Sequence, residues 1–146
     1  MPSRAKGKGK GTSTFSLSRK ELNYLKSHEL GRLATSSGEG MPHVVPIIYA
    51  LDGSSPVIAV DYGTKKLKNL RENQSAALLV DEYDPNSGIL LQGRAEVLER
   101  GKEYLRLLKI LFDRFEYYRN NPWKEGESPI VKLVPEHCAS WGIPKG

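Results

Sequence analysis

Residues 31–51 read GRLATSSGEGMPHVVPIIYAL, and this stretch decides the fold class. Two runs with strand character, GRLATSS and MPHVVPIIYAL, flank the glycine-rich turn GEG, a pattern typical of a β-hairpin. A second turn, DGSSP, leads into PVIAVDY, so three strands in meander order are the simplest interpretation. Because proline cannot donate a hydrogen bond to a strand ladder, Pro46 predicts an edge strand or a bulge.

Two more strands, a long helix and a last strand are predicted downstream. The strands SAALLVDEY and GILLQGRAEVLER are joined by the turn DPNSG. Residues 101–120 have the period of an amphipathic helix, whose apolar stripe consists of Tyr104, Leu108, Leu111, Phe115 and Tyr118. In the last strand, PIVKLVPEHCASWGI, Pro135 marks an edge or a bend. In total, six strands and three helices favour an antiparallel barrel with helices packed outside it.

The folded part is predicted to begin near residue 15. Ser18 and Glu21 have the spacing of a capping box, and Leu17 and Leu22 have that of a hydrophobic staple. We therefore expect a short helix over residues 19–28.

Residues 1–14 are rich in Gly and Lys and contain four cations and no acid: Arg4, Lys6, Lys8 and Lys10. Without them, 18 basic residues face 17 acidic ones, so the tail carries most of the net charge of +5. We expect a flexible basic tail over residues 1–14 and one domain over residues 15–146. Nucleic-acid binding is then expected, if at all, only through the tail.

Composition places the chain among globular proteins. Its 146 residues fit one domain, and its apolar runs are shorter than a membrane span. No apolar segment follows the basic N-terminus, so no signal peptide is expected. The single cysteine, Cys138, cannot form an internal disulfide or a cysteine-based metal site. These features predict a cytoplasmic protein without a membrane partner or a metal.

The segment DYGTKKLKNLREN, residues 61–73, places three lysines and an arginine between two strands. In one interpretation these cations form the solvated face of a short helix. In the other, Gly63 permits a tight turn, Thr64 caps the helix, and the free N–H groups of the first turn attract an anion. Lysines in a first turn oppose the helix dipole, and a bound phosphate would offset that cost. The position after a strand favours the phosphate.

The series of segments along the chain resembles a known family. The order LATSSGEGMPHVVPIIYAL, VIAVDYGTKKLKNLREN, SAALLVDEYD and LLQGRAEVLE is similar to that of flavin-binding split barrels related to pyridoxamine 5′-phosphate oxidase. The most specific element is K-x-x-N-L-R, formed here by Lys66, Asn69, Leu70 and Arg71. The resemblance covers residues 30–141. It implies a mainly β (α+β), Greek-key antiparallel split β-barrel with peripheral helices, which works as a homodimer with its cofactor in a groove at the dimer interface.

The resemblance also implies which residues hold the cofactor. Lys66 is the expected phosphate ligand, with Thr64 and Lys65 beside it. The strand HVVPII lines the flavin ring, and residues 59–61 flank the ribityl chain. The complete expected set is His43, Val44, Val45, Pro46, Ile47, Ile48, Ala59, Val60, Asp61, Thr64, Lys65, Lys66 and Asn69.

The first functional hypothesis is an FMN-binding oxidoreductase that passes a hydride or electrons between the flavin and a small substrate. Some relatives hold the deazaflavin coenzyme in the same groove, and PHVVPIIYALDG with K-x-x-N-L-R resembles that branch at least as well. Full-length pyridoxamine phosphate oxidases carry further substrate-binding arginines near the C-terminus, whereas this chain ends soon after Trp141, so the vitamin B6 reaction is not expected. Two hypotheses without catalysis are a barrel that only stores or senses flavin or haem, and a nucleic-acid-binding barrel.

Four further residues are candidates for chemistry or for packing. His43 is equally compatible with a flavin neighbour and an exposed strand residue. His28 is expected to be structural. His137 and Cys138 are adjacent in a strand and point to opposite faces, so we expect Cys138 to be buried packing rather than a nucleophile. No pair of carboxylates or acid–histidine pattern favours acid–base hydrolysis, and the sequence identifies no catalytic residue or substrate.

Overall fold

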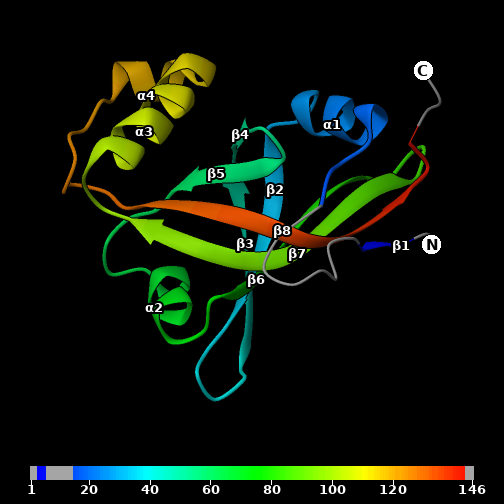
Figure 1. The fold of residues 1–146 in the computed structure, drawn as a ribbon, viewed down its shortest axis with the longest axis horizontal. Helices are drawn as coiled ribbons and strands as arrows, with labels where there is room; N and C mark the ends of the chain where they lie inside the picture. Colours follow the sequence, from blue (N-terminus) through cyan, green and yellow to red (C-terminus); the bar gives the residue numbers. More distant parts are fainter. Residues whose placement is uncertain (1–2, 6–14, 144–146) are drawn as a thin grey trace.

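The structure of the protein is a computed structural model that describes residues 3–5 and 15–143 (Figure 1). Its strands are β1 (Ser3–Ala5), β2 (Leu30–Ser36), β3 (Pro42–Ile48), β4 (Ala50–Asp52), β5 (Ser55–Ala59), β6 (Ser75–Glu82), β7 (Ser87–Leu98) and β8 (Ile130–Trp141). Its helices are α1 (Arg19–Lys26), α2 (Lys65–Glu72), α3 (Lys102–Arg114) and α4 (Glu116–Asn120). The longest of them, α3, has 13 residues, and none of the described helices could cross a membrane.

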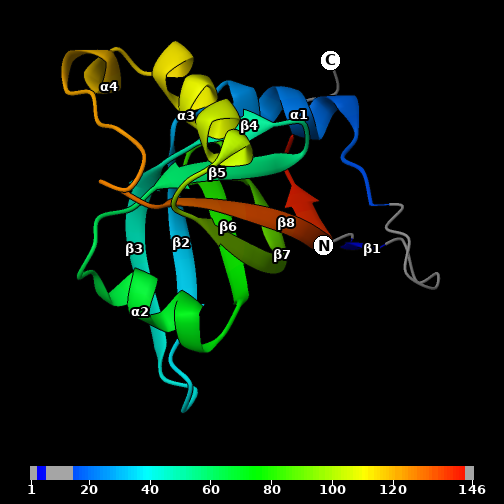
Figure 2. The same cartoon turned by 60° about the vertical axis from the view of Figure 1, so that its left-hand side comes forward.

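The strands form one antiparallel, curled sheet in the order β3-β2-β6-β7-β8-β5-β4 (Figure 2). The predicted hairpin pairs β2 with β3, and the second turn pairs β4 with β5. Because β3 and β4 lie at opposite edges yet are joined through Tyr49 alone, the two edges of the sheet must meet at this residue. The predicted antiparallel split barrel with peripheral helices is therefore confirmed.

Both predictions from strand prolines are confirmed. Pro46 lies in β3, which is an edge strand of the sheet. Pro135 lies in β8 opposite Gly93, where the register of the β7–β8 pair shifts. Edges and bulges are the places where a strand tolerates the missing N–H group of proline.

The number and the bounds of the elements differ from the predictions. The described residues form eight strands rather than six, since the second strand divides at Tyr49 and β1 pairs with β8. The expected helix over residues 101–120 divides into α3 and α4, because Phe115 adopts an extended backbone and buries its ring. The helix predicted after residue 18 is confirmed as α1, together with its capping box.

Three residues of the predicted tail, Ser3–Ala5, pair with residues 137–139 of β8. Residues 1–2 and 6–14 lie outside the described residues, as do residues 144–146. The predictions of a flexible tail and of nucleic-acid binding through it therefore remain untested there.

The buried side chains form two clusters on the two sides of the sheet. The larger cluster fills the barrel, where Leu33, Leu78 and Leu91 are fully buried. The smaller lies between α3 and the outer side of β4 and β5, where Leu107 and Leu111 are fully buried. Figure 2 shows α3 crossing these two strands, whereas α2 lies at the other end of the barrel. The helix α2 is thus separate from the packing of α3.

Candidate functional site

The helix α2 begins at a sharp turn after β5. Gly63 has φ +82°, a conformation that favours glycine. Thr64 occupies the N-cap position, but its Oγ1 donates to the carbonyl of Asp61 at 2.8 Å and makes no hydrogen bond to the helix. The predicted position of Thr64 at the N-cap is therefore confirmed, whereas the side-chain hydrogen bond of a cap is absent. As a result, the N-cap side chain leaves the N–H groups of the first turn free to serve another acceptor.

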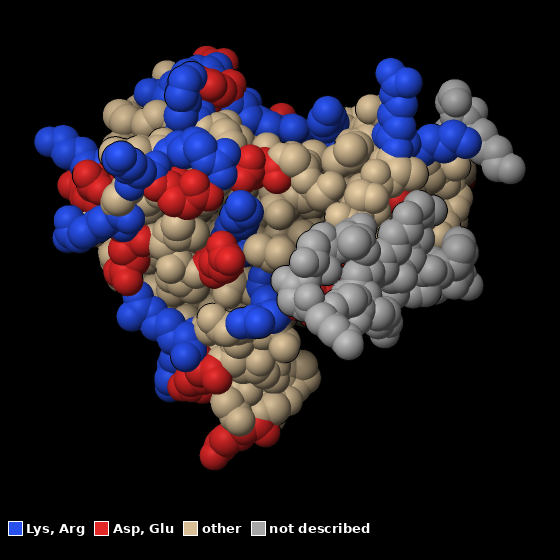
Figure 3. All heavy atoms as spheres, viewed as in Figure 1, with Lys and Arg blue, Asp and Glu red and all other residues tan. Residues whose placement is uncertain are grey.

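The lysines of α2 form no ion pairs within the described residues. Lys65 and Lys68 are exposed and Lys66 is half-buried, and none of the three pairs with an acid of residues 15–143. Arg71 lies 3.5 Å from Glu99, which also accepts a hydrogen bond from Tyr62. Figure 3 shows Lys and Arg atoms interspersed with Asp and Glu atoms along the left-hand side of the molecule, including the lower left where α2 lies. The first turn therefore combines free N–H groups with uncompensated positive charge.

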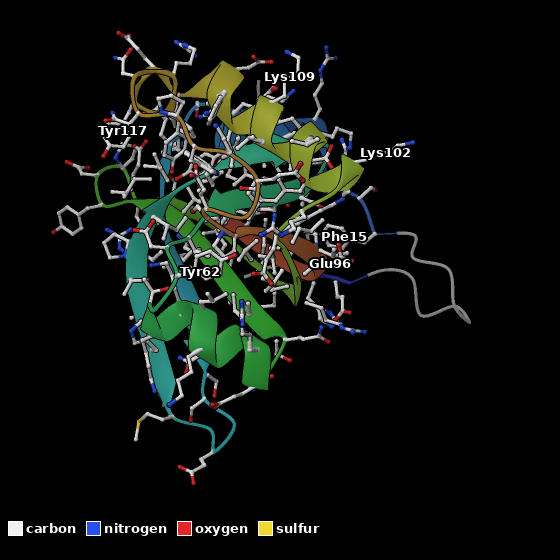
Figure 4. The ribbon with its side chains drawn as sticks, turned by 90° about the vertical axis from the view of Figure 1, so that its left-hand side faces the viewer. Phe15, Tyr62, Glu96, Lys102, Lys109 and Tyr117 are labelled. Carbon is white, nitrogen blue, oxygen red and sulfur yellow. The ribbon has the colours of Figure 1, made fainter. Side chains whose placement is uncertain are left out.

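A hollow of about 460 Å³ opens on the solvent side of α2 and the preceding turn. Its lining residues are Tyr62, Gly63, Thr64, Lys65, Leu67, Lys68 and Arg71. Figure 4 shows Tyr62 close to this end of the barrel. The Tyr62 hydroxyl donates to Glu99, and this bond raises the pKa of the hydroxyl. Of the predicted residues the hollow contains Thr64 and Lys65, and Lys66 does not line it.

The opposite side of α2 packs against the β2–β3 hairpin. The Asn69 side chain is completely buried, and its Nδ2 donates to Thr35 Oγ1 at 3.0 Å. At the end of the helix, Glu72 Oε1 accepts a hydrogen bond from the Gly38 amide at 2.8 Å. Lys65 and Lys66 both lie one turn before Asn69, but they differ in exposure. Lys66 is half-buried, whereas Lys65 is exposed and lines the solvent-facing hollow.

Two buried polar atoms close to this packing, His43 Nδ1 and Asn69 Oδ1, have no hydrogen-bond partner among the described residues. Thr35, which binds Asn69, is directly opposite His43 in the β2–β3 pair. Residues opposite each other in a ladder point to the same face. His43 Nδ1, Thr35 and Asn69 therefore form one group of buried polar atoms on this side of the hairpin, while the His43 side chain as a whole is half-buried.

The other predicted residues of β3 alternate between the two faces. Val45 and Ile47 pack toward the barrel, whereas Val44 and Pro46 are exposed on the outer face, with Val44 62% exposed. Ile48 is half-buried at the end of the strand.

The outer face continues from β3 across two neighbouring strands. Val44 is opposite Ala34, and Ala34 is opposite Ala77. In the next row, Pro46 is opposite Arg32, which is opposite Leu79. Small and apolar residues thus form most of this part of the outer face, called here the outer wall.

The residues expected at the ribityl chain differ in how exposed they are. Val60 is buried, its N–H donates to the Pro129 carbonyl at 3.0 Å, and its own carbonyl accepts from Ser128 Oγ at 2.6 Å. Ala59 is half-buried and Asp61 is exposed. Of these three, Ala59 and Asp61 retain surface that a ligand could contact.

The remaining candidates have structural environments. Cys138 is buried, and its Sγ lies 3.5 Å from the buried Glu21 carboxylate, while the adjacent His137 is exposed. His28 lies 2.6 Å from Glu82 and stacks on Tyr24. The predicted burial of Cys138 is confirmed, whereas the structural role of His28 stays a prediction.

The site also contains residues that sequence reasoning did not assign to it. Lys68 and Arg71 line the solvent-facing hollow, and Thr35 anchors Asn69. A signal for Thr35 was present, since it shares the inward face of its strand with Leu33, where an apolar residue is expected. The partner of a buried hydroxyl cannot be read from the sequence, because Thr35 and Asn69 are 34 residues apart.

Together these groups fit a flat, phosphorylated ligand. The free N–H groups and cations of α2 suit a phosphate. The apolar wall on β3 and its neighbours suits an aromatic ring system.

Comparison with known proteins identifies a family and several proteins that are similar to this chain. Residues 18–142 match the family model described as pyridoxamine 5′-phosphate oxidase. A 5a,11a-dehydrotetracycline/5a,11a-dehydrooxytetracycline reductase from Streptomyces rimosus is 32% identical over 133 residues, which are 85% of this chain and 82% of the reductase. Among solved structures, the conserved hypothetical protein Rv2991 from Mycobacterium tuberculosis has a TM-score of 0.71 at 22% identity, covering 94% of this chain and 96% of that protein. HutZ, the haem storage protein from Vibrio cholerae, has a TM-score of 0.70 at 14% identity, covering 84% and 92%.

Proposed function

This chain belongs to the pyridoxamine 5′-phosphate oxidase family, and from that premise we propose that it is an oxidoreductase that uses FMN. The observation that carries the proposal is the start of α2, a helix that packs against β2. Uncapped N–H groups and three lysines without an acidic partner in the described residues meet there. The relative from Streptomyces rimosus, named as a reductase, supports the class of reaction. The substrate is a small molecule that reaches the flavin.

In this proposal Lys66 binds the phosphate, aided by the backbone of Thr64 and Lys65. The strand from His43 to Ile48 lines the ring, and Ala59 and Asp61 border the polyol chain. Asn69 is completely buried, so it contributes by holding α2 rather than by touching the ligand. When bound, FMN supplies the capacity to accept or donate a hydride or electrons. The protein residues bind it, orient it and exclude water from one face of its ring.

We further propose that the protein is a homodimer through the outer face of β3, β2 and β6. Leu30 and Val44 are 51% and 62% exposed on this face, and Met41, which directly precedes β3, is 67% exposed. Leu30 and Val44 lie in the rows on either side of the Pro46–Arg32 row. Exposed apolar side chains gathered on one sheet face are typical of an interface between subunits. A partner there would also cover the wall on which the ring lies. Sedimentation of the purified protein as a monomer would count against this arrangement.

The second candidate is an oxidoreductase that uses the deazaflavin coenzyme. The specific observation in its favour is the solvent-facing hollow, which presents Lys65, Lys68 and Arg71 on the side of α2 away from Lys66. These cations could meet the further carboxylates that this coenzyme carries beyond its phosphate. Under this candidate Lys68→Ala weakens binding of the deazaflavin coenzyme, whereas under the first it has little effect on FMN.

The deciding experiment is an absorption spectrum of the purified protein, followed by titration with FMN and with the deazaflavin coenzyme. Lys66→Ala is expected to weaken cofactor binding by about 10- to 100-fold, because it removes a charge-assisted contact. The matched control is Lys109→Ala on α3, which removes an exposed lysine at the other end of the molecule (Figure 4). Unchanged cofactor binding in Lys66→Ala would favour the alternative interpretation, in which the lysines only form the solvated face of α2. A haem spectrum would overturn the flavin proposal.

A further inference from the structure

The buried polar group of Thr35, His43 and Asn69, called here the helix–hairpin seam, lies between two parts of the proposed cofactor site. Asn69 belongs to α2, the phosphate helix, and His43 belongs to β3, the strand that lines the ring. Thr35 on β2 contacts the first and is directly opposite the second. The seam is therefore a physical connection between the phosphate end and the ring end of the site.

The central contact of the seam is shielded from water. Asn69 Nδ2 donates to Thr35 Oγ1, and the two residues are 0% and 4% exposed. Lys66 is one turn earlier in the helix, so the position of Asn69 sets the position of the Lys66 backbone. A shift of Asn69 away from Thr35 would move Lys66 relative to β3.

The seam also contains the two buried polar atoms that lack a partner among the described residues, His43 Nδ1 and Asn69 Oδ1. Buried polar groups in folded proteins are almost always hydrogen-bonded, and exceptions call for a functional explanation. Among the described residues, Asn69 is therefore held through its Nδ2 alone, by the bond to Thr35. Apolar side chains of the same size would fill the space without leaving unpaired atoms.

We propose that Thr35 and Asn69 are positioning residues that set the separation between the phosphate site at Lys66 and the ring wall on β3. This inference rests on the proposed function. A ligand that reaches both parts binds more tightly when their separation is correct, because the second contact forms without further loss of the ligand's conformational freedom. The affinity of a ligand that reaches only one part does not depend on this separation. The seam therefore selects a cofactor by the distance between its ring and its phosphate.

Riboflavin and FMN distinguish these cases, since riboflavin has the ring and the polyol chain but lacks the phosphate. Thr35→Val keeps the shape of the side chain and removes the hydroxyl. It is expected to weaken FMN binding by about tenfold and to leave riboflavin binding unchanged. Thr35→Ser keeps the hydroxyl and is expected to restore FMN binding. Asn69→Leu, a second variant of similar size, is expected to reproduce the effect of Thr35→Val.

A double variant separates positioning from general destabilisation. If Thr35 acts through Lys66, Thr35→Val adds no further loss of FMN affinity to Lys66→Ala. Additive losses, or an equal loss of riboflavin and FMN binding in Thr35→Val and Asn69→Leu, would show a merely structural role and overturn the inference.

The outcomes also separate this inference from the proposed function. If the unmodified protein binds neither FMN nor the deazaflavin coenzyme, both proposals are wrong. If Lys66→Ala weakens FMN binding while Thr35→Val and Asn69→Leu do not, the phosphate site stands and the positioning role is wrong.

Discussion

The helices α2 and α3 are both rich in cations, yet their cations have different surroundings. On α3, Arg106 binds both carboxylate oxygens of Asp52, at 3.0 and 2.7 Å, and Lys109 lies 2.8 Å from Asp113. On α2, Lys65, Lys66 and Lys68 take part in no ion pair of the described residues.

The first turns differ in the same way. The first turn of α3 contains Glu103, which complements the helix dipole, whereas the first turn of α2 contains no acid. The first residue of α3, Lys102, also lacks an ion pair in the described residues, but Glu103 follows it directly. The comparison therefore rests on the lysines of α2, which have no acid in their own first turn and which bind the phosphate under the proposed function.

The largest expected effect on stability concerns the buried leucines, which both helices have. Leu70 of α2 is 1% exposed and Leu111 of α3 is fully buried, each in one of the two clusters. Leu70→Ala and Leu111→Ala are each expected to lower the free energy of unfolding by about 2–5 kcal/mol, because both leave a cavity. Chemical denaturation measures this. A much smaller loss for Leu70→Ala would mean that α2 is held only at its ends.

The next effect concerns the paired cations of α3. The bonds from Arg106, with burial opposing them and Lys132 helping, lower the pKa of Asp52 from 3.8 to about 2. Since the carboxylate is favoured in the folded state, its contribution to stability is complete above the ordinary pKa and is lost as pH falls through about 2.

Asp52→Asn is expected to cost about 1 kcal/mol at neutral pH. It should also reduce the loss of stability between about pH 4 and pH 2. Thermal unfolding over this pH range tests both parts. An unchanged acid slope in the variant would assign the slope to other carboxylates.

A smaller change in the free energy of unfolding is expected when a first-turn charge is reversed, and its sign is opposite in the two helices. Lys65→Glu is expected to raise the free energy of unfolding of the cofactor-free protein by about 0.3–1 kcal/mol, since an acid in the first turn complements the dipole. The same change should weaken FMN binding. Glu103→Lys, the reverse change in the first turn of α3, should only destabilise. Chemical denaturation and FMN titration measure the two effects, and a Lys65→Glu protein that is less stable and binds FMN as before would contradict the functional interpretation of α2.

The smallest effect is expected at Lys109. Its pair with Asp113 is well solvated, with the two side chains 75% and 66% exposed. Lys109→Ala should change the free energy of unfolding by less than about 0.5 kcal/mol and leave cofactor binding unchanged. Any loss of FMN affinity in this variant, measured by titration, would place the cofactor near α3 instead of α2.

The sequence by itself determined the elements whose signals are local. The alternating runs around GEG, the capping box of α1 and the edge position of Pro46 each follow from neighbouring residues or from the chemistry of one residue. The K-x-x-N-L-R pattern likewise located the helix that carries the candidate phosphate site.

Tertiary structure alone decided the rest. The break at Tyr49 follows from the curling of the sheet, where the Tyr49 hydroxyl donates to the carbonyl of Leu25 at 2.6 Å. The division of residues 101–120 at Phe115 follows from burial of that ring against the second cluster.

The pairing of charges and buried polar groups was decided in the same way. Whether a cation is paired depends on residues far away in the chain, as Arg106 and Asp52 show. For the same reason the sequence did not identify Thr35, whose contact with Asn69 forms only where α2 packs against the hairpin. Ion pairs and buried hydrogen bonds of this kind form between surfaces that only folding brings together, because closing the intervening loop costs entropy that local sequence signals do not record.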